Sequence, residues 1–394
     1  MTARPLACVM GDIDLVRALG LAGIRCAVVV EEGDPTCYSR FTEARIGWLD
    51  PWKEPEALVS RLLEFAAKQP APPVLFYQED RSLLLTSRYR DRLAGAFRFV
   101  VPDRELTEDL VDKARFQVLA ERLELPVPRT RRAAPHQTGP DAAEGLRYPL
   151  VVKPLTRKTE SWMPIAGANK ALRVESPAAL RELWARLAEA ELEVLVQEWI
   201  DGPETAIESY HAYVDAEGFV AAEFTGKKVR TYPVECGYST ALSLTRAADV
   251  AELGRELARR MGFRGVAKLD FKRAPDGSLY LLEVNPRFNL WHHLGAVAGV
   301  NLPAVVYADL AGLPRPEVAL RKPDARWCYL WYDAMASRGW GVPVHQWVPW
   351  ALSCEAKSAV AIDDPMPFLR GVVWRRLSRA LRRPGGPLLA QAGH

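Results

Sequence analysis

A buried strand around residue 283 leads into three polar side chains that share one face. The stretch Leu279–His293 reads LYLLEVNPRFNLWHH, and its apolar start predicts a strand. Glu283, Asn285 and Arg287 follow at intervals of two residues. Because residues two apart in an extended chain point to the same side, we expect a carboxylate, an amide and a guanidinium to lie together where this strand ends.

The strand is expected to be the second arm of a hairpin that turns at the sequence APDG, 274–277. With a two-residue loop, Asp270 faces Leu281 and lies diagonally from Glu283, roughly 7–8 Å away at the backbone. A four-residue loop keeps both carboxylates on one face. A three-residue loop with a glycine bulge breaks that parity unless a second irregularity compensates.

Two carboxylates and an amide oxygen in one place predict a cation site. Asp270, Glu283 and Asn285 offer hard oxygen ligands, which suit Mg²⁺, and Mg²⁺ commonly brings substrate phosphates. The alternative is an acid pair at a solvated strand end, offset by Lys268 and Arg287. The hairpin alone does not decide between the two interpretations.

Length and composition indicate a globular chain of two or three domains, with 394 residues, 49% hydrophobic and 26% charged. The net charge of +3 is too small to predict nucleic-acid binding. Six cysteines without a CxxC pair favour reduced thiols over a disulfide framework or a zinc site. No apolar run resembles a signal peptide or approaches the roughly 18 residues of a membrane span. We therefore expect a cytoplasmic protein.

The first third alternates strands and helices, which predicts a parallel sheet with helices on both faces. Strands are expected at 6–10, 26–30, 73–80 and 97–103, and a helix around 15–22 that ends at Gly23. A dinucleotide fingerprint needs three glycines in the first turn, and this turn supplies only Gly11. A structural Rossmann-like lobe is therefore favoured over a nicotinamide or flavin site.

From residue 106 the pattern becomes α+β, with antiparallel strand pairs flanked by helices. A helix is expected from Thr107 as N-cap to just before Pro126, another from Ser176, and a hairpin turn at 215–218. Strands are expected in 148–155 and 193–202. The predicted domains are 1–105, 106–314 and 315–394.

No Walker loop occurs, so single lysines are the candidates for holding phosphates. Lys113 stands in the first turns of its helix, and Lys153 ends an apolar strand, where it is costly to bury without an anionic partner. The polar segment 155–169 has little periodicity, which is typical of a mobile lid.

The last part holds five tryptophans before a basic end, RGVVWRRLSRALRRPGG. An amphipathic helix for an acidic surface or a membrane is one interpretation. We favour a terminal helix that packs Val373, Trp374, Leu377 and Leu381 on the body.

Four motifs in this order resemble the ATP-grasp superfamily over most of the chain. They are VDKARFQVLAERLELPVPRT, PLVVKP, VLVQEWIDGPE, and YLLEVNPRF followed by GAVAGVNLP. The last looks like the metal-binding strand and following helix of carboxylate–amine ligases and carbamoyl-phosphate synthetases. The resemblance implies an ATP-grasp fold with an N-terminal Rossmann-like lobe, thus α/β and α+β.

The resemblance also implies roles for single residues. Lys113 and Lys153 would contact the ATP phosphates, with Lys170 in the lid as a third candidate. Arg287 would sit beside the transferred phosphate and the substrate carboxylate. The hinge would hold adenine and ribose through Gln197, Glu198, Trp199, Ile200 and Glu204. One or two Mg²⁺, or Mn²⁺ in their place, would bind Asp270, Glu283 and Asn285.

Some positions match the family pattern loosely. Lys227 and Arg230 are both candidates for a basic contact to the γ-phosphate. His292 and His293 either line the acceptor pocket or pack beside Trp291. Cys236 faces the active site or, the favoured interpretation, is an inert buried thiol.

The chemistry implied is that of an ADP-forming carboxylate–amine ligase that activates a small carboxylate as an acyl phosphate. Its partners would be the carboxylate and an amine, with an amino acid among them and no nucleic acid. Dimers are common in the family, which leaves a homodimer open. The alternatives are carbamoyl-phosphate-synthetase-like phosphorylation of bicarbonate or carbamate, and a non-catalytic nucleotide sensor.

Overall fold

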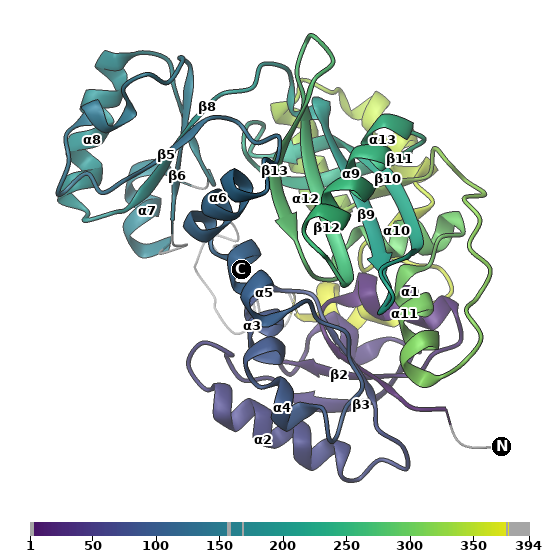
Figure 1. Cartoon of the computed structure of the whole chain (residues 1–394). Helices are drawn as coiled ribbons and strands as arrows, with labels where there is room; N and C mark the ends of the chain where they lie inside the picture. Colours follow the sequence, from purple (N-terminus) through teal and green to yellow (C-terminus); the bar gives the residue numbers. More distant parts are fainter. Residues whose placement is uncertain (1–3, 156–158, 168, 376, 378–394) are drawn as a thin grey trace.

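The computed structural model describes residues 4–155, 159–167, 169–375 and 377. Within these residues the strands form three sheets. Figure 1 shows the first lobe in purple and blue, the small lobe with β5, β6 and β8, and the large sheet in green. Helices α5 and α6, Arg104–Val111 and Lys113–Arg122, lie between the three parts.

The first lobe is a four-stranded parallel sheet in the order β3-β2-β1-β4. Its strands are Ala7–Met10, Cys26–Val30, Thr42–Gly47 and Val74–Tyr77, numbered β1 to β4. Its helices are α1 Ile13–Leu21, α2 Pro55–Ala66, α3 Asp80–Arg88 and α4 Arg90–Leu93. The parallel sheet confirms the alternating pattern, but the strand expected at 97–103 is wrong, because only Arg98 bridges to Val74. β3 escaped notice because Ile46 is its one fully buried side chain.

The helix expected from Thr107 is two helices. Asp103 caps α5 by accepting from the backbone N–H groups of Glu105 and Leu106, and Thr107 lies buried inside that helix. Asp112 interrupts the pattern and caps α6. Aspartate is as good an N-cap as threonine, so two caps account for the shift and for the break.

The small lobe is an antiparallel sheet in the order β5-β8-β6-β7. Its strands are Thr130–Ala133, Leu150–Pro154, Leu172–Val174 and Val194–Glu198, numbered β5 to β8. Helix α8, Pro177–Glu189, is capped by Ser176 as expected. The expected lid includes a helix, α7 Thr159–Ala166, whose Trp162 is buried in the lobe's core. Positions 156–158 and 168 of the lid lie outside the described residues.

The large sheet has seven strands in the order β13-β12-β9-β10-β11-β14-β15. They are β9 Ile207–Val214, β10 Val220–Tyr232, β11 Tyr238–Thr245, β12 Gly265–Arg273, β13 Leu279–Asn285, β14 Arg326–Cys328 and β15 Ala356–Lys357. Helix α9, Ala248–Arg260, packs on one face, and α10 Trp291–Ala298 with α11 Leu302–Ala311 on the other. The hydrophobic core on the α10 and α11 side of the sheet also contains first-lobe residues such as Val9 and Phe76. One core therefore holds the first lobe against the large sheet.

The C-terminal part completes this body. β14 and β15 extend the large sheet. The segment that connects these two strands contains helices α12, Leu330–Gly339, and α13, Val344–Ser353. The terminal helix η4, Pro367–Trp374, packs on η1, Pro35–Tyr38, of the first lobe.

The packing expected for the terminal helix is wrong for Trp374 and Leu377. Trp374 and Leu377 are exposed and Val373 is half-buried, whereas Pro367 and Gly371 face the body. Gly371 has no side chain and so lets the helix approach Pro35 closely. Leu381 lies outside the described residues.

Across the described residues, no single helix is long and apolar enough to cross a membrane. Helices α10 and α11 pass a length and composition test only together, as a pair bent by 88°. Both are largely buried against the sheet and the first lobe.

Candidate active site

The two carboxylates of the β12–β13 hairpin are direct cross-strand partners. Arg273 pairs with Leu279 and Phe271 with Leu281, so the turn is one residue longer than the two-residue loop. By itself, this extra residue would place Asp270 and Glu283 on opposite faces of the hairpin. A bulge between Phe271 and Asp270 then restores the face, and Asp270 pairs with Glu283. The expectation that Asp270 faces Leu281 is therefore wrong, and the compensating irregularity is present.

This hairpin end has its own internal hydrogen bonds. The Asp270 carboxylate accepts from the Ser209 hydroxyl and, at 2.5 Å, from Lys268 Nζ. Glu283 Oε1 accepts from Asn285 Nδ2 at 3.1 Å. The Lys268 contact is the one expected of an offset acid pair, so a cation site would have to compete with it.

Glu283 remains charged in this setting. Protein atoms near the carboxyl favour its neutral form, but the positive charge of Lys268 and the hydrogen bond from Asn285 act in the opposite sense. The net result is a pKa well below the usual range for Glu283. The side chain is also exposed, so an ionised carboxylate is available to a ligand from solution.

Arg287 joins the hairpin end to the first lobe. Its Nε donates to Asp80 Oδ1 at 2.5 Å and its Nη1 to the Gln78 carbonyl at 3.0 Å. Its Nη2 donates to Asn285 Oδ1 at 3.2 Å. The guanidinium therefore lies where the carboxyl end of β4 meets the end of β13, and Asp80 and Gln78 are contacts that the sequence did not suggest.

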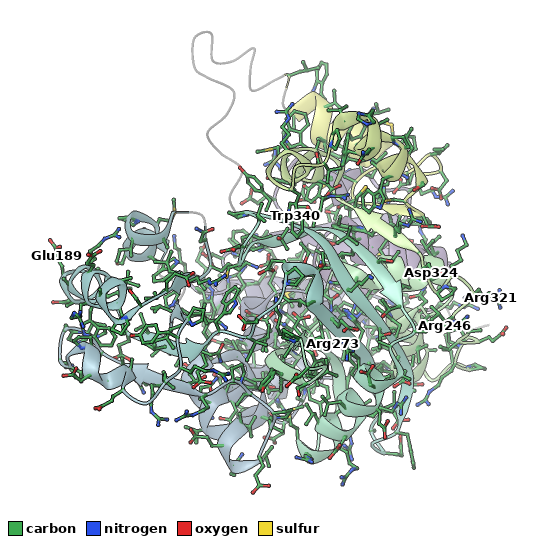
Figure 2. All side chains as sticks on the ribbon, turned by 90° about the horizontal axis from the view of Figure 1, so that it is seen from above. Glu189, Arg246, Arg273, Arg321, Asp324 and Trp340 are labelled. Carbon is green, nitrogen blue, oxygen red and sulfur yellow. The ribbon has the colours of Figure 1, made fainter. Side chains whose placement is uncertain are left out.

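A pocket of about 400 Å³ lies between the small lobe and the large sheet. It is lined by Arg173, Trp199, Asp201, Gly202, Pro203, Glu204, Val234, Glu235 and Trp340. Figure 2 shows Trp340 between the small lobe, marked by Glu189, and the end of β11 in the large sheet, marked by Arg246. Trp340 follows α12 and donates from Nε1 to the Thr231 carbonyl at 3.0 Å. The C-terminal part thus contributes one wall of the pocket.

Lys153 lies in β6 of the small lobe, next to β8, which leads into the hinge. Its Nζ donates to Gln197 Oε1 at 2.9 Å. Burial lowers the pKa of Lys153, although the carboxylates of Glu283 and Glu204 favour its charged form. Carboxylates of the pocket and of the hairpin end therefore both influence the charge of Lys153.

Two further lysines lie around the same site. Lys113 Nζ donates to the Pro154 carbonyl at 2.5 Å, next to Lys153. Lys170 Nζ stands 3.6 Å from the centre of the Tyr238 ring, and its charge helps to keep Glu283 ionised. The structure thus gathers Lys113, Lys153 and Lys170 around one cleft.

The two candidates for the γ-phosphate contact differ in burial. Arg230 is buried and makes a bidentate ion pair with Asp333, at 2.9 and 2.6 Å. Lys227 is exposed. Lys228 lies between them in sequence and points to Glu204, 3.9 Å away. Neighbouring side chains of a strand point to opposite faces, and this alternation along β10 could have distinguished Lys228 from Lys227.

The hinge that follows β8 is anchored by side chains. Gln197 and Glu198 are buried, and Glu198 accepts from the Arg147 backbone at 3.0 Å. Ile200 is buried too, whereas Trp199 lines the pocket. Lys272 donates to the carbonyls of Gly202 and Pro203, at 2.7 and 2.6 Å, which holds the loop before Glu204. Lys272 was missed from sequence, although it stands two residues after Asp270 on the same strand.

Burial indicates the roles of His292, His293 and Cys236. His292 is fully buried, which lowers its pKa to about 3, and His293 Nδ1 lies 2.7 Å from Asp14 Oδ1. Both histidines are packed side chains. Cys236 is half-buried beside the pocket, and its backbone N–H donates to Glu204 Oε1 at 3.2 Å. Burial raises the pKa of its thiol, which makes it a poor nucleophile.

The chain is similar in sequence to several known proteins. A family model described as "ATP-grasp in the biosynthetic pathway with Ter operon" matches residues 191–330. A D-alanine–D-alanine ligase from Ectopseudomonas mendocina is 28% identical over 219 residues, 51% of this chain and 64% of that protein. A D-aspartate ligase from Enterococcus faecium is 24% identical over 57% of this chain and 55% of that protein. The chain spans less than two thirds of the length of both relatives.

Solved structures share the fold at low identity. An N5-carboxyaminoimidazole ribonucleotide synthetase bound to ADP has a TM-score of 0.63 at 17% identity, covering 82% of this chain and 81% of that one. An L-amino acid ligase from Bacillus licheniformis has a TM-score of 0.58 at 17% identity, covering 79% and 75%. These likenesses show that the chain has an ATP-grasp fold. The match of residues 191–330 to an ATP-grasp family model is consistent with that fold.

The hairpin end has the donor chemistry of a magnesium site. Asp270, Glu283 and Asn285 supply two carboxylates and one amide oxygen from one strand pair, and such hard donors suit Mg²⁺. Among the described residues no group of three His, Cys, Asp or Glu is placed to hold a metal. The amide would therefore have to complete the set, together with oxygens from a ligand.

Proposed function

We propose that the protein is an ATP-dependent ligase that activates a small-molecule carboxylate as an acyl phosphate and joins it to an amine. The observation that carries this proposal is the convergence of charge across the cleft. Glu204 of the pocket and Glu283 of the large sheet both favour the charged form of Lys153 in the small lobe, and Lys228 Nζ of β10 lies 3.9 Å from Glu204. Such an arrangement can hold a nucleotide triphosphate and a second anion together.

The nucleotide would lie across the hinge. Its adenine would contact the hinge backbone between Gln197 and Ile200, and its ribose hydroxyls Glu204. Lys113, Lys153 and Lys170 would contact the phosphates. Asp270, Glu283 and Asn285 would hold one or two Mg²⁺, or Mn²⁺, which would neutralise charge on the phosphates.

The reaction proceeds in two displacements. An oxygen of the substrate carboxylate attacks the γ-phosphorus of ATP, the bond to the β-phosphate oxygen breaks, and ADP leaves. The amine then attacks the acyl carbon, inorganic phosphate leaves, and the amine proton passes to solvent. Arg287 stands at the junction with the first lobe, where it would orient the carboxylate and balance charge on the transferred phosphoryl group.

An amino acid is the substrate class we favour. Relatives named as D-alanine–D-alanine ligase and D-aspartate ligase, and a solved L-amino acid ligase of the same fold, support that choice. A carbamoyl-phosphate-synthetase-like reaction and a non-catalytic sensor are the competing proposals. We keep the cytoplasm as the expected location and a homodimer as an open alternative.

The test is ADP formation from Mg-ATP across pooled amino acids and small carboxylic acids. Formation that requires a carboxylate and an amine supports the ligase. Formation with bicarbonate alone supports the carbamoyl-phosphate alternative. ATP binding without turnover across the pool supports the sensor.

Lys228, rather than its neighbour Lys227, is expected to matter for ATP binding. Replacing Lys228 with Ala removes a charge beside Glu204, and we expect the KM for ATP to rise by about tenfold. Lys227→Ala is the matched control, because this neighbouring lysine is exposed, and its kinetics should stay near those of the parent. The reverse order of effects would move the phosphate contact to Lys227.

A further inference from the structure

The terminal segment exposes apolar and basic side chains together. Leu369, Trp374 and Leu377 are 49%, 66% and 52% exposed. Ile362, just before the helix, is fully exposed. Large apolar side chains gathered on one exposed segment mark an interaction surface rather than scattered surface residues.

The apolar residues recur at a regular interval. Leu369, Val373 and Leu377 are four residues apart, which places them along one side of a helical segment. In the sequence Leu381 follows at the same interval. The opposite side of η4 is already used, because Pro367 and Gly371 face the first lobe.

The charge of the segment has one sign. Residues 365–394 contain no Asp or Glu. They contain six arginines, at positions 370, 375, 376, 379, 382 and 383. Arg370 is exposed, whereas Arg375 lies 3.8 Å from Glu31 of the first lobe.

We propose that this segment holds the protein on the surface of a membrane that contains anionic lipids. Leu369, Val373 and Leu377 would enter the boundary between headgroups and acyl chains, as interfacial amphipathic helices do. Trp374 suits the same depth, since its ring is apolar and its N–H is polar. The arginines would meet the negative lipid headgroups.

Contacts just before η4 fix this helix to the first lobe. Asp364 is buried and accepts from the Ser39 hydroxyl at 2.8 Å and from the Arg40 backbone at 2.9 Å. Arg17 lies 3.6 Å from the same carboxylate. A membrane bound to the exposed side of η4 would therefore bind the first lobe with it.

Two other occupants fit less well. A second copy of the chain would bring two arginine-rich segments together without a carboxylate on either, which is unfavourable. A nucleic acid would satisfy the arginines but would leave the apolar stripe against phosphates. An anionic lipid surface satisfies both kinds of side chain.

The test is co-sedimentation of the full chain with lipid vesicles. We expect binding to vesicles in which roughly a third of the lipid is phosphatidylserine, about tenfold weaker binding to phosphatidylcholine alone, and a decline with salt. Leu369→Gln combined with Leu377→Gln should lower binding about tenfold, and Arg370→Glu should also weaken it. Val118→Gln is the matched control, because Val118 is an exposed apolar residue on helix α6.

Several outcomes would overturn the proposal. They are equal binding to both vesicle types, no binding, or binding that the leucine substitutions leave unchanged. A concentration-dependent dimer that the leucine substitutions abolish would assign the surface to a second copy. Tighter retention on a nucleic acid than on anionic vesicles would assign it to that polymer. Because vesicle binding needs no turnover, its failure would leave the proposed ligase activity untouched.

Discussion

Replacing Glu283 with Gln is expected to abolish Mg²⁺-dependent ADP formation. The pKa of Glu283 is lowered, so its side chain is charged, and the residue pairs directly with Asp270 across the hairpin. Glutamine keeps the size of the side chain and removes the charge that a divalent cation requires. We expect turnover to fall by at least about a thousandfold, which corresponds to ~4 kcal/mol of transition-state stabilisation.

Folding should survive this substitution, because Glu283 is exposed and exposed substitutions usually change stability by about 0.5 kcal/mol or less. Glu217→Gln is the matched control, since Glu217 is an exposed carboxylate at the other hairpin turn of the same sheet. Its turnover and magnesium dependence should equal those of the parent. If Glu283→Gln turns over normally, Glu283 binds no essential metal, and the acid pair offset by Lys268 becomes the correct interpretation.

Replacing Arg230 with Ala is expected to cause the largest loss of stability. Arg230 and Asp333 form a buried, bidentate ion pair, and Arg230 stacks 3.9 Å from the centre of the Trp350 ring. Asp333 also accepts from Thr240 and Trp347. Removing one charge leaves the other buried without its partner, which costs about 3–5 kcal/mol. Urea denaturation should show this loss of unfolding free energy.

The control is Arg259→Ala, an exposed arginine on helix α9, which should change stability by about 0.5 kcal/mol or less. Combining Arg230→Met with Asp333→Leu should destabilise less than the sum of the single changes, because no buried charge remains. A variant Arg230→Ala that keeps its stability but loses ATP affinity would return Arg230 to the phosphate site.

Local patterns predicted the elements that depend on nearby residues. Ser176 caps α8, and Leu180, Leu183, Trp184 and Leu187 form its buried face, as the helical spacing indicated. The strand β3 and the two caps at Asp103 and Asp112 were missed. An edge strand with one buried side chain has little apolar signal, and several residues in one stretch can cap a helix.

The hairpin shows where sequence reasoning stops. The alternation of residues predicted that Asp270 and Glu283 share a face, and they do, but as direct partners. The turn length and the bulge together determine that register, and neither can be read from the residues alone.

Long-range contacts account for the parts of the candidate site that were not predicted. Asp80 and Gln78 reach Arg287 from the first lobe, and Trp340 reaches the pocket from the C-terminal part. No local pattern links residues so far apart in the chain. The ion pair between Arg230 and Asp333 could not be predicted either, because the two residues are far apart in the sequence.

The measurement that tests the central claim most directly is ADP formation from Mg-ATP with single amino acids and carboxylic acids drawn from an active pool. The ligase proposal predicts ADP and phosphate in equal amounts, a product that contains both the acid and the amine, and no reaction when either is omitted. ADP formed without a carboxylate, or bound ATP that never turns over with any acid and amine, would contradict it.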